Sequence, residues 1–475
     1  MTAAADPGRP GPASARAPFL WGFRLIPRIE TYPEVVSFAQ TDIGKFTLLG
    51  IFAIGLWYTH PLWQVLIVLL AVVTLLPQYR RMVLTFGTLV WGFGIIWPWT
   101  VRPLLLPAAM VLILAALLFW AASRFPHSGF GRRPVASLLT GFALSVLLAS
   151  YLPRGGYLWA ASWDFLTVAG AYLWFIAYSL LDAGSKSRDP FALQVGTYRP
   201  FWGGTNTPFA KGAAYLRRIE AHNPEQLAVA QLKGLKLLAW SVLLDLFLRK
   251  AFLPVVHGRL GIPVYSQLFE LSVQRGSFPW YVGWASLIAN FIEDLARLSI
   301  FGHRIIASCR MAGFLALRNT CRPLASRSIA EFWNRYYYYF KELLVDCFFY
   351  PTFMRYFKGH RRWRLFAATF AAACFGNAFF HFFRDLGYIE ESGFWKALAG
   401  FQAYIFYTVV LAVGIGISQL RERRVETTGW IRGRLVPAFW VIGFFCILSV
   451  FDYTDKRYPL QECFRFLAHL FNLTS

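Results

Sequence analysis

Residues 103–123 read PLLLPAAMVLILAALLFWAAS, and this stretch decides the fold class of the chain. It contains no charged side chain, and its length matches the about 20 apolar residues of a helix that crosses a bilayer. Comparable apolar runs occur before and after it along the sequence. Together they predict an all-α fold, a polytopic transmembrane helical bundle with about eleven or twelve spans.

The candidate spans flank a long polar loop that begins near residue 183. They lie at residues 46–59, 61–77, 82–99, 103–123, 136–152, 158–182, 229–256, 263–301, 303–318, 363–385, 397–420 and 434–452. The first is short for a complete crossing. The run 263–301 is interrupted by glycine and charge, so it can consist of two pieces.

The composition supports the same conclusion. Of the 475 residues, 57% are hydrophobic and 15% are charged, whereas soluble globular chains contain about 45–50% apolar and about 25% charged residues. The mean hydropathy is +0.46. These values exclude a soluble enzyme, a disordered protein and a fibrous repeat. Aromatic residues make up 18% of the chain, which suits a protein with many membrane–water boundaries, where Trp and Tyr are enriched.

The positive charge of the chain indicates membrane topology rather than nucleic-acid binding. Lys and Arg number 47 against 24 Asp and Glu, a net charge of +23. Basic residues favour alternate connections, with Arg80 and Arg81 in the second and Arg132 and Arg133 in the fourth. Because cytoplasmic loops collect Lys and Arg, the N-terminus is expected in the cytoplasm. The compact loops favour a bacterial inner (plasma) membrane.

The same pattern divides the chain into five parts. Residues 1–44 are expected to form a cytoplasmic tail and juxtamembrane segment, 45–182 an N-terminal transmembrane bundle, and 183–228 a cytoplasmic loop. Residues 229–452 are expected to form the functional core, followed by a C-terminal tail at 453–475. The core differs from the first bundle because ionisable residues occur within its apolar runs. Such residues are costly inside a membrane and are therefore functional candidates.

The segment 328–353, SIAEFWNRYYYYFKELLVDCFFYPTF, is amphipathic at helical spacing. One side of this helix is apolar and aromatic. Another side carries the polar groups of Asn334, Tyr337 and Lys341. At membrane depth such a stripe must face protein or a wet cavity rather than lipid. We expect Pro351 to stop the helix.

The second candidate is His381, in the segment FGNAFFHFFRD at 375–385. Asn377 and Asp385 lie four residues before and after it, so the three side chains share one helix face. A lone histidine in an apolar span is more often a hydrogen-bonded core residue than a catalyst. The ordinary histidine pKa of about 6.5 nevertheless suits proton transfer near neutral pH. A positioned general base contributes typically 10²–10⁴-fold to a rate.

These residues resemble the hallmark of the membrane-bound O-acyltransferases, F-W-x-R-W-H-x-x-L-S-x-W-x-R-D-Y-x-Y-x-P, which is followed by an isolated histidine in a hydrophobic helix. The matching places are held by Phe332, Trp333, Arg335, Asp346, Phe349 and Pro351. His381 lies at the distance of the second histidine. Blocks at 231–240, 290–297 and 317–333 resemble the family in the same order, so the resemblance covers roughly residues 195–420. The chain resembles a divergent, bacterial-type member.

The chain departs from the family at the first polar position of the hallmark. That position is His in many bacterial members and Asn or Asp in others, whereas this chain has Tyr337, preceded by Tyr336 in place of Trp. Phe380 and Phe382 replace the Trp and Gly around the second histidine. A tyrosine is a poor base at pH 7 because its pKa is about 10. Two interpretations are open: Asn334 takes over the orienting role, or the site is degenerate.

The resemblance implies a ring of helices around a central tunnel, and the transfer of an acyl group to a hydroxyl. His381 would be the general base, and Tyr337 or Asn334 would orient the acceptor or the imidazole. The supporting residues would be Trp333, Arg335, Lys341, Asp346 and Asn377.

The donor would be an acyl-CoA or an acyl-carrier thioester, and the acceptor a hydroxyl of a glycan, a lipid or a small molecule. No tightly bound cofactor, no metal and no nucleic acid is expected. The expected partners are the lipid bilayer and a membrane or periplasmic accessory protein. The alternative is a catalytically degenerate protein on the same scaffold that acts as a binding or accessory subunit. A transporter, suggested by buried charge alone, would show two related halves with broken spans.

Overall fold

The computed structural model describes residues 25–90, 105–185, 188–421, 429, 431–452 and 458–473. Within these ranges all regular structure is helical and no β-strand occurs. An isolated bridge joins Glu220 to Phe314. The predicted all-α fold is therefore confirmed.

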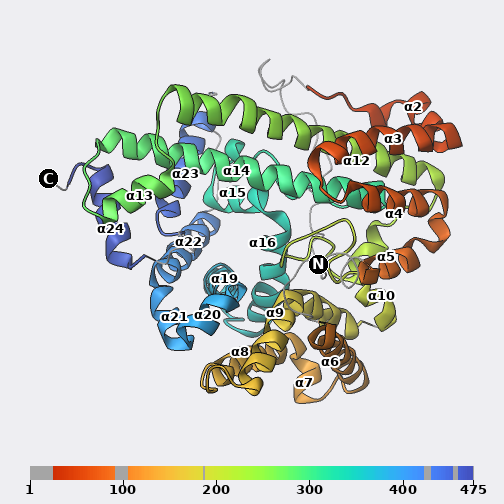
Figure 1. Ribbon diagram of the computed structural model, residues 1–475, viewed down its shortest axis with the longest axis horizontal. Helices are drawn as coiled ribbons and strands as arrows, with labels where there is room; N and C mark the ends of the chain where they lie inside the picture. Colours follow the sequence, from red (N-terminus) through yellow and green to blue (C-terminus); the bar gives the residue numbers. More distant parts are fainter. Residues whose placement is uncertain are drawn as a thin grey trace.

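The helices before residue 184 form two groups (Figure 1). The first group contains α2 (Pro33–Gln40), α3 (Asp42–Thr59), α4 (Trp63–Leu75) and α5 (Arg80–Leu89). The second group contains α6 (Leu105–Arg124), α7 (Gly129–Arg132), α8 (Pro134–Ala149) and α9 (Tyr157–Ala183). Figure 1 shows the first group at the right of the view and the second at the bottom.

The middle of the chain contributes two long helices that pack side by side across the top of the view (Figure 1). One is α12 (Pro224–Leu246), which continues through the π-helical segments Phe247–Phe252 and Pro254–Arg259. The other is α14 (Trp280–Met311). Between and before them lie the short helices α10 (Phe191–Val195), α11 (Ala213–Ile219) and α13 (Tyr265–Val273).

The last third of the chain folds beside these helices. It begins with α15 (Ile329–Tyr336), α16 (Tyr338–Leu344), the π-helical segment Val345–Phe349 and α17 (Tyr350–Arg355). A second helical run contains α18 (Arg361–Phe370), the π-helical segment Ala371–Gly376 and α19 (Asn377–Arg384). The chain then forms α20 (Leu386–Ser392), α21 (Phe394–Gly400), α22 (Gln402–Leu420), a π-helical segment (Ile431–Leu435), α23 (Val436–Ser449) and α24 (Leu460–Leu470).

Six helices of the described chain are long and apolar enough to cross a membrane. They are Leu105–Arg124, Tyr157–Ala183, Pro224–Arg259, Arg361–Arg384, Gln402–Leu420 and Ile431–Ser449. The segments Trp63–Leu75 and Pro77–Leu89 qualify only as a pair, which is bent by 110°. The chain is thus a polytopic helical membrane protein, and its described part contains six helices that could span a membrane, or seven if the bent pair is one span.

The other predicted spans are helical but shorter or more polar than a complete crossing. Helix α8 has 16 residues, and α3 begins with the charged residues Asp42 and Lys45. A single 32-residue helix, α14, covers parts of two predicted runs and carries charge along its length. Residues 91–99 of the run 82–99 lie outside the described residues, as do 1–24 of the N-terminal tail.

The prediction that Pro351 stops its helix is wrong. The helical run continues as α17 to Arg355. A proline ring clashes with the carbonyl group four residues earlier, and it has no N–H to donate. The wider turns of the π-helical segment Val345–Phe349 precede Pro351 and relieve this conflict. Proline is therefore accommodated without ending the helix.

Two further π-helical segments stand in the same relation to proline. Phe247–Phe252 and Ile431–Leu435 each end two residues before a proline, at Pro254 and Pro437. The spacing is the one found at Pro351. The helices of this protein therefore continue through these prolines by widening locally just before them.

Helix α16 lies where the two largest hydrophobic clusters meet. Phe340 and Leu343 belong to the cluster that α6, α8 and α9 form with α19–α22. Tyr339 belongs to the cluster that α3 and α4 form with α12 and α14. The aromatic ring of Tyr337 packs against both clusters. The hallmark-like segment is thus at the centre of the packed molecule.

Candidate functional site

Tyr337 lies at a break in the hallmark-like segment. Its φ of −136° and ψ of 77° are not helical, so α15 ends just before it and α16 begins just after it. The Tyr337 hydroxyl donates a hydrogen bond to Oγ1 of Thr207 at 3.1 Å. Thr207 is buried and comes from the segment that joins α10 to α11. The break therefore turns the tyrosine toward a loop that is distant in sequence.

His381 lies on α19, within the apolar helical run Arg361–Arg384. Its imidazole is half-buried between two aromatic rings. The ring centroid lies 4.7 Å from that of Tyr404 and 5.6 Å from that of Phe340. Its Nδ1 atom is buried and has no hydrogen-bond partner within the described chain.

Phe340 brings the two candidates close together. Its ring centroid lies 5.5 Å from that of Tyr337 and 5.6 Å from that of His381. Trp333 contacts the same ring edge-on at 6.1 Å. The structure therefore gathers Tyr337, His381 and Trp333 around one phenylalanine, although they come from α15, α19 and the break before α16.

Asn377 lies one turn before His381 and is buried. Its Oδ1 atom accepts a hydrogen bond from the Tyr404 hydroxyl at 3.2 Å, while its Nδ2 atom has no partner in the described chain. The ring of Tyr404 lies against the His381 imidazole and also against the ring of Tyr407. The centroids of the Tyr404 and Tyr407 rings are 5.0 Å apart. Tyr404 is the residue that sequence reasoning missed, since it lies in an apolar span without a motif.

Asn334 and Arg335 are not brought to this group. Asn334 is exposed on α15 and makes no hydrogen bond in the described chain. The guanidinium group of Arg335 lies 2.7 Å from the carboxylate of Glu331, one turn earlier. It also donates to the carbonyl oxygen of Arg322 at 3.4 Å. Both side chains follow α15 outward, because the break at Tyr337 ends the helical periodicity that would align them with α16.

Lys341 and Asp346 take part in a separate cluster of charged groups. Lys211 Nζ lies 2.8 Å from Asp346 Oδ2 and 2.9 Å from Glu342 Oε2. The Tyr178 hydroxyl donates to Asp346 at 3.0 Å, and Lys341 forms an ion pair with Glu342. Burial alone would lower the pKa of Lys211 and raise that of Glu342. The ion pairs outweigh burial and place the pKa of Lys211 above, and that of Glu342 below, the ordinary value.

Lys211 joins the polar loop to the hallmark-like segment. It adopts a left-handed conformation, with φ of 51°, and lies four residues after Thr207, which contacts Tyr337. The loop is therefore held at two points, by a hydrogen bond at Tyr337 and by ion pairs at Glu342 and Asp346. A lysine in a basic loop gave no signal of this role in the sequence.

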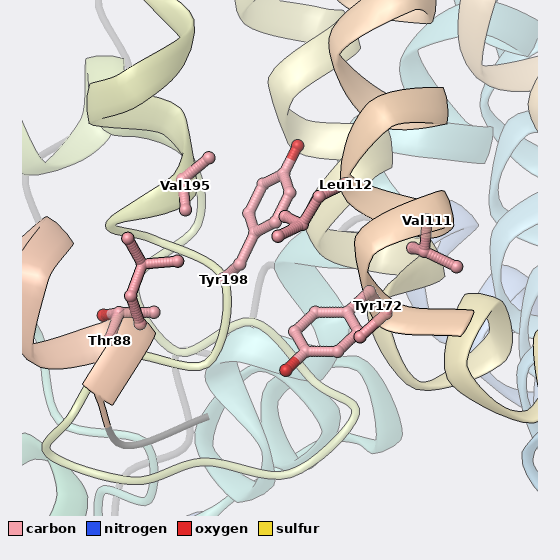
Figure 2. Close-up of a pocket in the computed structure, with 8 residues that line it drawn as sticks. Thr88, Val111, Leu112, Tyr172, Val195 and Tyr198 are labelled. Atoms are coloured by element: carbon pink, nitrogen blue, oxygen red, sulfur yellow. The ribbon is translucent and has the colours of Figure 1, made fainter. Parts of the chain in front are cut away.

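A small pocket lies between α5, α6, α9 and α10 and leaves no room for a substrate. Figure 2 shows Thr88 and Val195 on one side of it and Val111 and Leu112 on the other, with the rings of Tyr172 and Tyr198 between them. Its volume is about 20 Å³, close to the ~10–15 Å³ that one water molecule requires.

Comparisons with known proteins give no assignment. A scan against family models and a search of curated proteins find no match to this chain. Among the described residues, no three His, Cys, Asp or Glu side chains are grouped so that they could hold a metal ion. The resemblance to the O-acyltransferases therefore stays a prediction.

Proposed function

We propose that the protein is a membrane-embedded acyltransferase that moves an acyl group from a thioester donor to a hydroxyl group. The supporting observation is that His381, half-buried on an apolar helix, packs against the Phe340 ring that Tyr337 also contacts. A polar ring at this depth is costly without a hydrogen bond. A substrate hydroxyl would supply the missing hydrogen bond.

In the proposed reaction, the imidazole of His381 takes the proton of the acceptor hydroxyl. The hydroxyl oxygen bonds to the thioester carbonyl carbon, and the carbonyl oxygen becomes negatively charged. This intermediate then collapses with cleavage of the carbon–sulfur bond, and the imidazolium returns its proton to the thiolate.

A hydrogen-bond donor must stabilise the oxyanion in a dry site. The Tyr337 hydroxyl is a better candidate than Arg335, whose guanidinium group is paired with Glu331. The donor role requires that the Tyr337 hydroxyl exchange its bond to Thr207 for one to the oxyanion.

The proposal includes a cellular setting. The donor would be an acyl-CoA or an acyl-carrier thioester, reached through a tunnel within the helical ring. The acceptor would be a glycan, lipid or small-molecule hydroxyl. The membrane would be a bacterial inner membrane with the N-terminus in the cytoplasm, as the distribution of Arg and Lys suggests.

The test is acyl transfer by the detergent-purified protein, with labelled acetyl-CoA and longer acyl-CoA as donors and a membrane extract as acceptor. His381→Ala should reduce transfer at least 10²-fold, and Tyr337→Phe should reduce it partly. His222→Ala is the matched control, because His222 is exposed near the start of α12. Equal transfer by wild type and His381→Ala would contradict the proposal.

A second candidate function is that of a catalytically degenerate binding or accessory subunit. Two observations favour it: the Tyr337 hydroxyl is already bonded to Thr207, and the buried Nδ1 of His381 has no orienting partner in the described chain. A general base normally needs such a partner to fix its tautomer. Folded wild-type protein without His381-dependent transfer to any acceptor would favour this candidate.

A further inference from the structure

A second cavity, distinct from the small pocket of Figure 2, lies between the polar loop, the connection from α3 to α4, and α14. Its volume is about 320 Å³, far above the ~10–15 Å³ required by one water molecule. It is lined by His60, Pro61, Arg199, Pro200, Trp202, Gly203, Gly204, Phe301, Arg304, Ile305 and Ser308. The described part of the lining thus contains two arginines and no carboxylate.

Arg199 comes from the polar loop and has unused donors. Its Nη2 atom donates to Oδ1 of Asn206 at 2.6 Å, and its guanidinium group lies 5.4 Å from the centroid of the Tyr172 ring. Its Nε atom is buried without a partner in the described chain. Neither contact is with an acid, so the positive charge of Arg199 is not neutralised by the described protein.

Arg304 comes from α14 and is similarly placed. Its Nη1 atom donates to the carbonyl oxygen of Thr59, at the end of α3, and its Nε atom is buried without a partner in the described chain. Asp245 acts on it electrostatically. That carboxylate is already paired with Arg249 at 3.0 Å and bonded to the Tyr58 hydroxyl at 3.2 Å.

The neutral polar residues of the lining are Ser308, whose hydroxyl donates to the carbonyl oxygen of Arg304 at 3.2 Å, Trp202 and His60. The indole Nε1 of Trp202 is buried without a partner in the described chain. Burial, followed by the nearby Arg304, lowers the pKa of His60, so this imidazole is neutral at pH 7. The lining of the cavity therefore offers hydrogen-bond donors together with the positive charges of two guanidinium groups, those of Arg199 and Arg304.

We infer that this cavity binds a phosphate group. Guanidinium groups bind phosphate through charge-assisted hydrogen bonds, often two at a time. A phosphate monoester carries about −1.5 to −2 charges at pH 7, which matches Arg199 and Arg304 together. Both guanidinium groups are partly buried and have no ion pair in the described chain, and each has a buried Nε atom without a partner; a bound phosphate would supply both the charge and the hydrogen bonds.

The cavity adjoins the candidate site without being part of it. Phe301 lines the cavity, and its ring centroid lies 6.2 Å from that of Phe209. Phe209 in turn lies 6.1 Å from Tyr337. The inference rests on the cavity alone and stands whether or not His381 is catalytic.

The phosphate group can belong to a soluble molecule or to a lipid headgroup, and two experiments distinguish these sources. The first measures binding of ³²P-labelled inorganic phosphate to the detergent-purified protein. The second measures retention of phosphatidic acid, whose headgroup is a phosphate monoester, against phosphatidylcholine after purification from nanodiscs of each lipid. Both use Arg199→Gln and Arg304→Gln, with Arg275→Gln as the control that removes an exposed arginine paired with Glu462.

A soluble ligand is supported if the wild-type protein binds phosphate saturably and this binding weakens about 10-fold or more in both Arg199→Gln and Arg304→Gln. The Arg275→Gln control should bind like the wild type. Retention of phosphatidic acid without binding of inorganic phosphate, lost in the same variants, supports a lipid headgroup. Because Arg304→Gln also removes the hydrogen bond to Thr59, size-exclusion chromatography of this variant checks that it is folded. Arg199→Lys, which keeps the charge but loses the planar fork, should weaken binding less than Arg199→Gln. The inference is overturned if the wild-type protein neither binds phosphate nor retains the anionic lipid. It is also overturned if Arg275→Gln loses binding as much as the two cavity variants do.

Discussion

Replacing Lys211 with methionine tests whether the buried ion cluster holds the polar loop against α16. The substitution keeps most of the apolar stem but removes the ammonium group, which lies 2.8 Å from Asp346 and 2.9 Å from Glu342. The lysine side chain is only 11% exposed. Water therefore cannot readily replace the lost cation, and both carboxylates lose a partner.

The magnitude follows from what remains around each carboxylate. Removing one partner of a buried ion pair costs about 3–5 kcal/mol. Asp346 keeps the bond from Tyr178 at 3.0 Å, and Glu342 keeps its pair with Lys341. These contacts offset part of the loss, so we expect the free energy of unfolding to fall by about 3 kcal/mol, at the lower end of that range.

The assay is equilibrium unfolding in detergent micelles, followed by tryptophan fluorescence. Lys396→Met is the matched control, because Lys396 is exposed on α21; its effect should stay within about 0.5 kcal/mol. The double variant Lys211→Met with Asp346→Asn should recover about 1 kcal/mol or more relative to Lys211→Met, since it removes one unpaired charge. Wild-type stability of Lys211→Met, or full additivity in the double variant, would refute the reasoning.

Three further predictions concern local features. The pKa of Glu342 is lowered in the fold. The stability that its carboxylate contributes is therefore complete above the unfolded-state pKa of about 4.3 and is lost as the pH falls through the folded-state pKa. Unfolding midpoints measured from pH 7 to pH 3 should show this loss, and Glu342→Gln should make it smaller. Gly376→Ala should cost about 1–3 kcal/mol because the new methyl group would lie 2.6 Å from the ring of Phe348. Thermal unfolding should find Gly387→Ala neutral or stabilising, since nothing lies within 4 Å there. Asn334→Ala should leave both the unfolding midpoint and any acyl-transfer rate unchanged, because the side chain is exposed.

The helical membrane fold could be predicted because its signal is local. The stretch 103–123 has the length and apolarity of a span, and α6 occupies nearly the same residues. The signal weakens where apolar runs contain charge. Helix α14 is one helix across a region that the sequence divides at residue 302, because apolar residues such as Leu287 and Ile306 pack within the protein along its whole length and its continuity does not depend on lipid.

The candidate site could be predicted only in part. His381 and Asn377 share α19 at the expected spacing, since an i, i+4 pair needs nothing beyond helical geometry. Asn334 does not follow Tyr337 around the same helix, because the backbone of Tyr337 leaves the helical region. At that break Tyr337 bonds to Thr207 and packs between two clusters, and these contacts are properties of the folded chain rather than of the segment.

The buried carboxylates show where this limit lies. A carboxylate such as Asp346 within an apolar segment requires a cation or a set of hydrogen bonds, so the sequence can predict that a partner exists. It cannot predict which partner, because Lys211 lies 135 residues earlier along the chain and reaches Asp346 only through a left-handed turn in the polar loop. The same reasoning applies to Arg199 and Arg304. Neither arginine forms an ion pair in the described chain, and Asp245, the carboxylate that acts on Arg304, is already paired with Arg249; the bound phosphate that we infer would supply the missing partner.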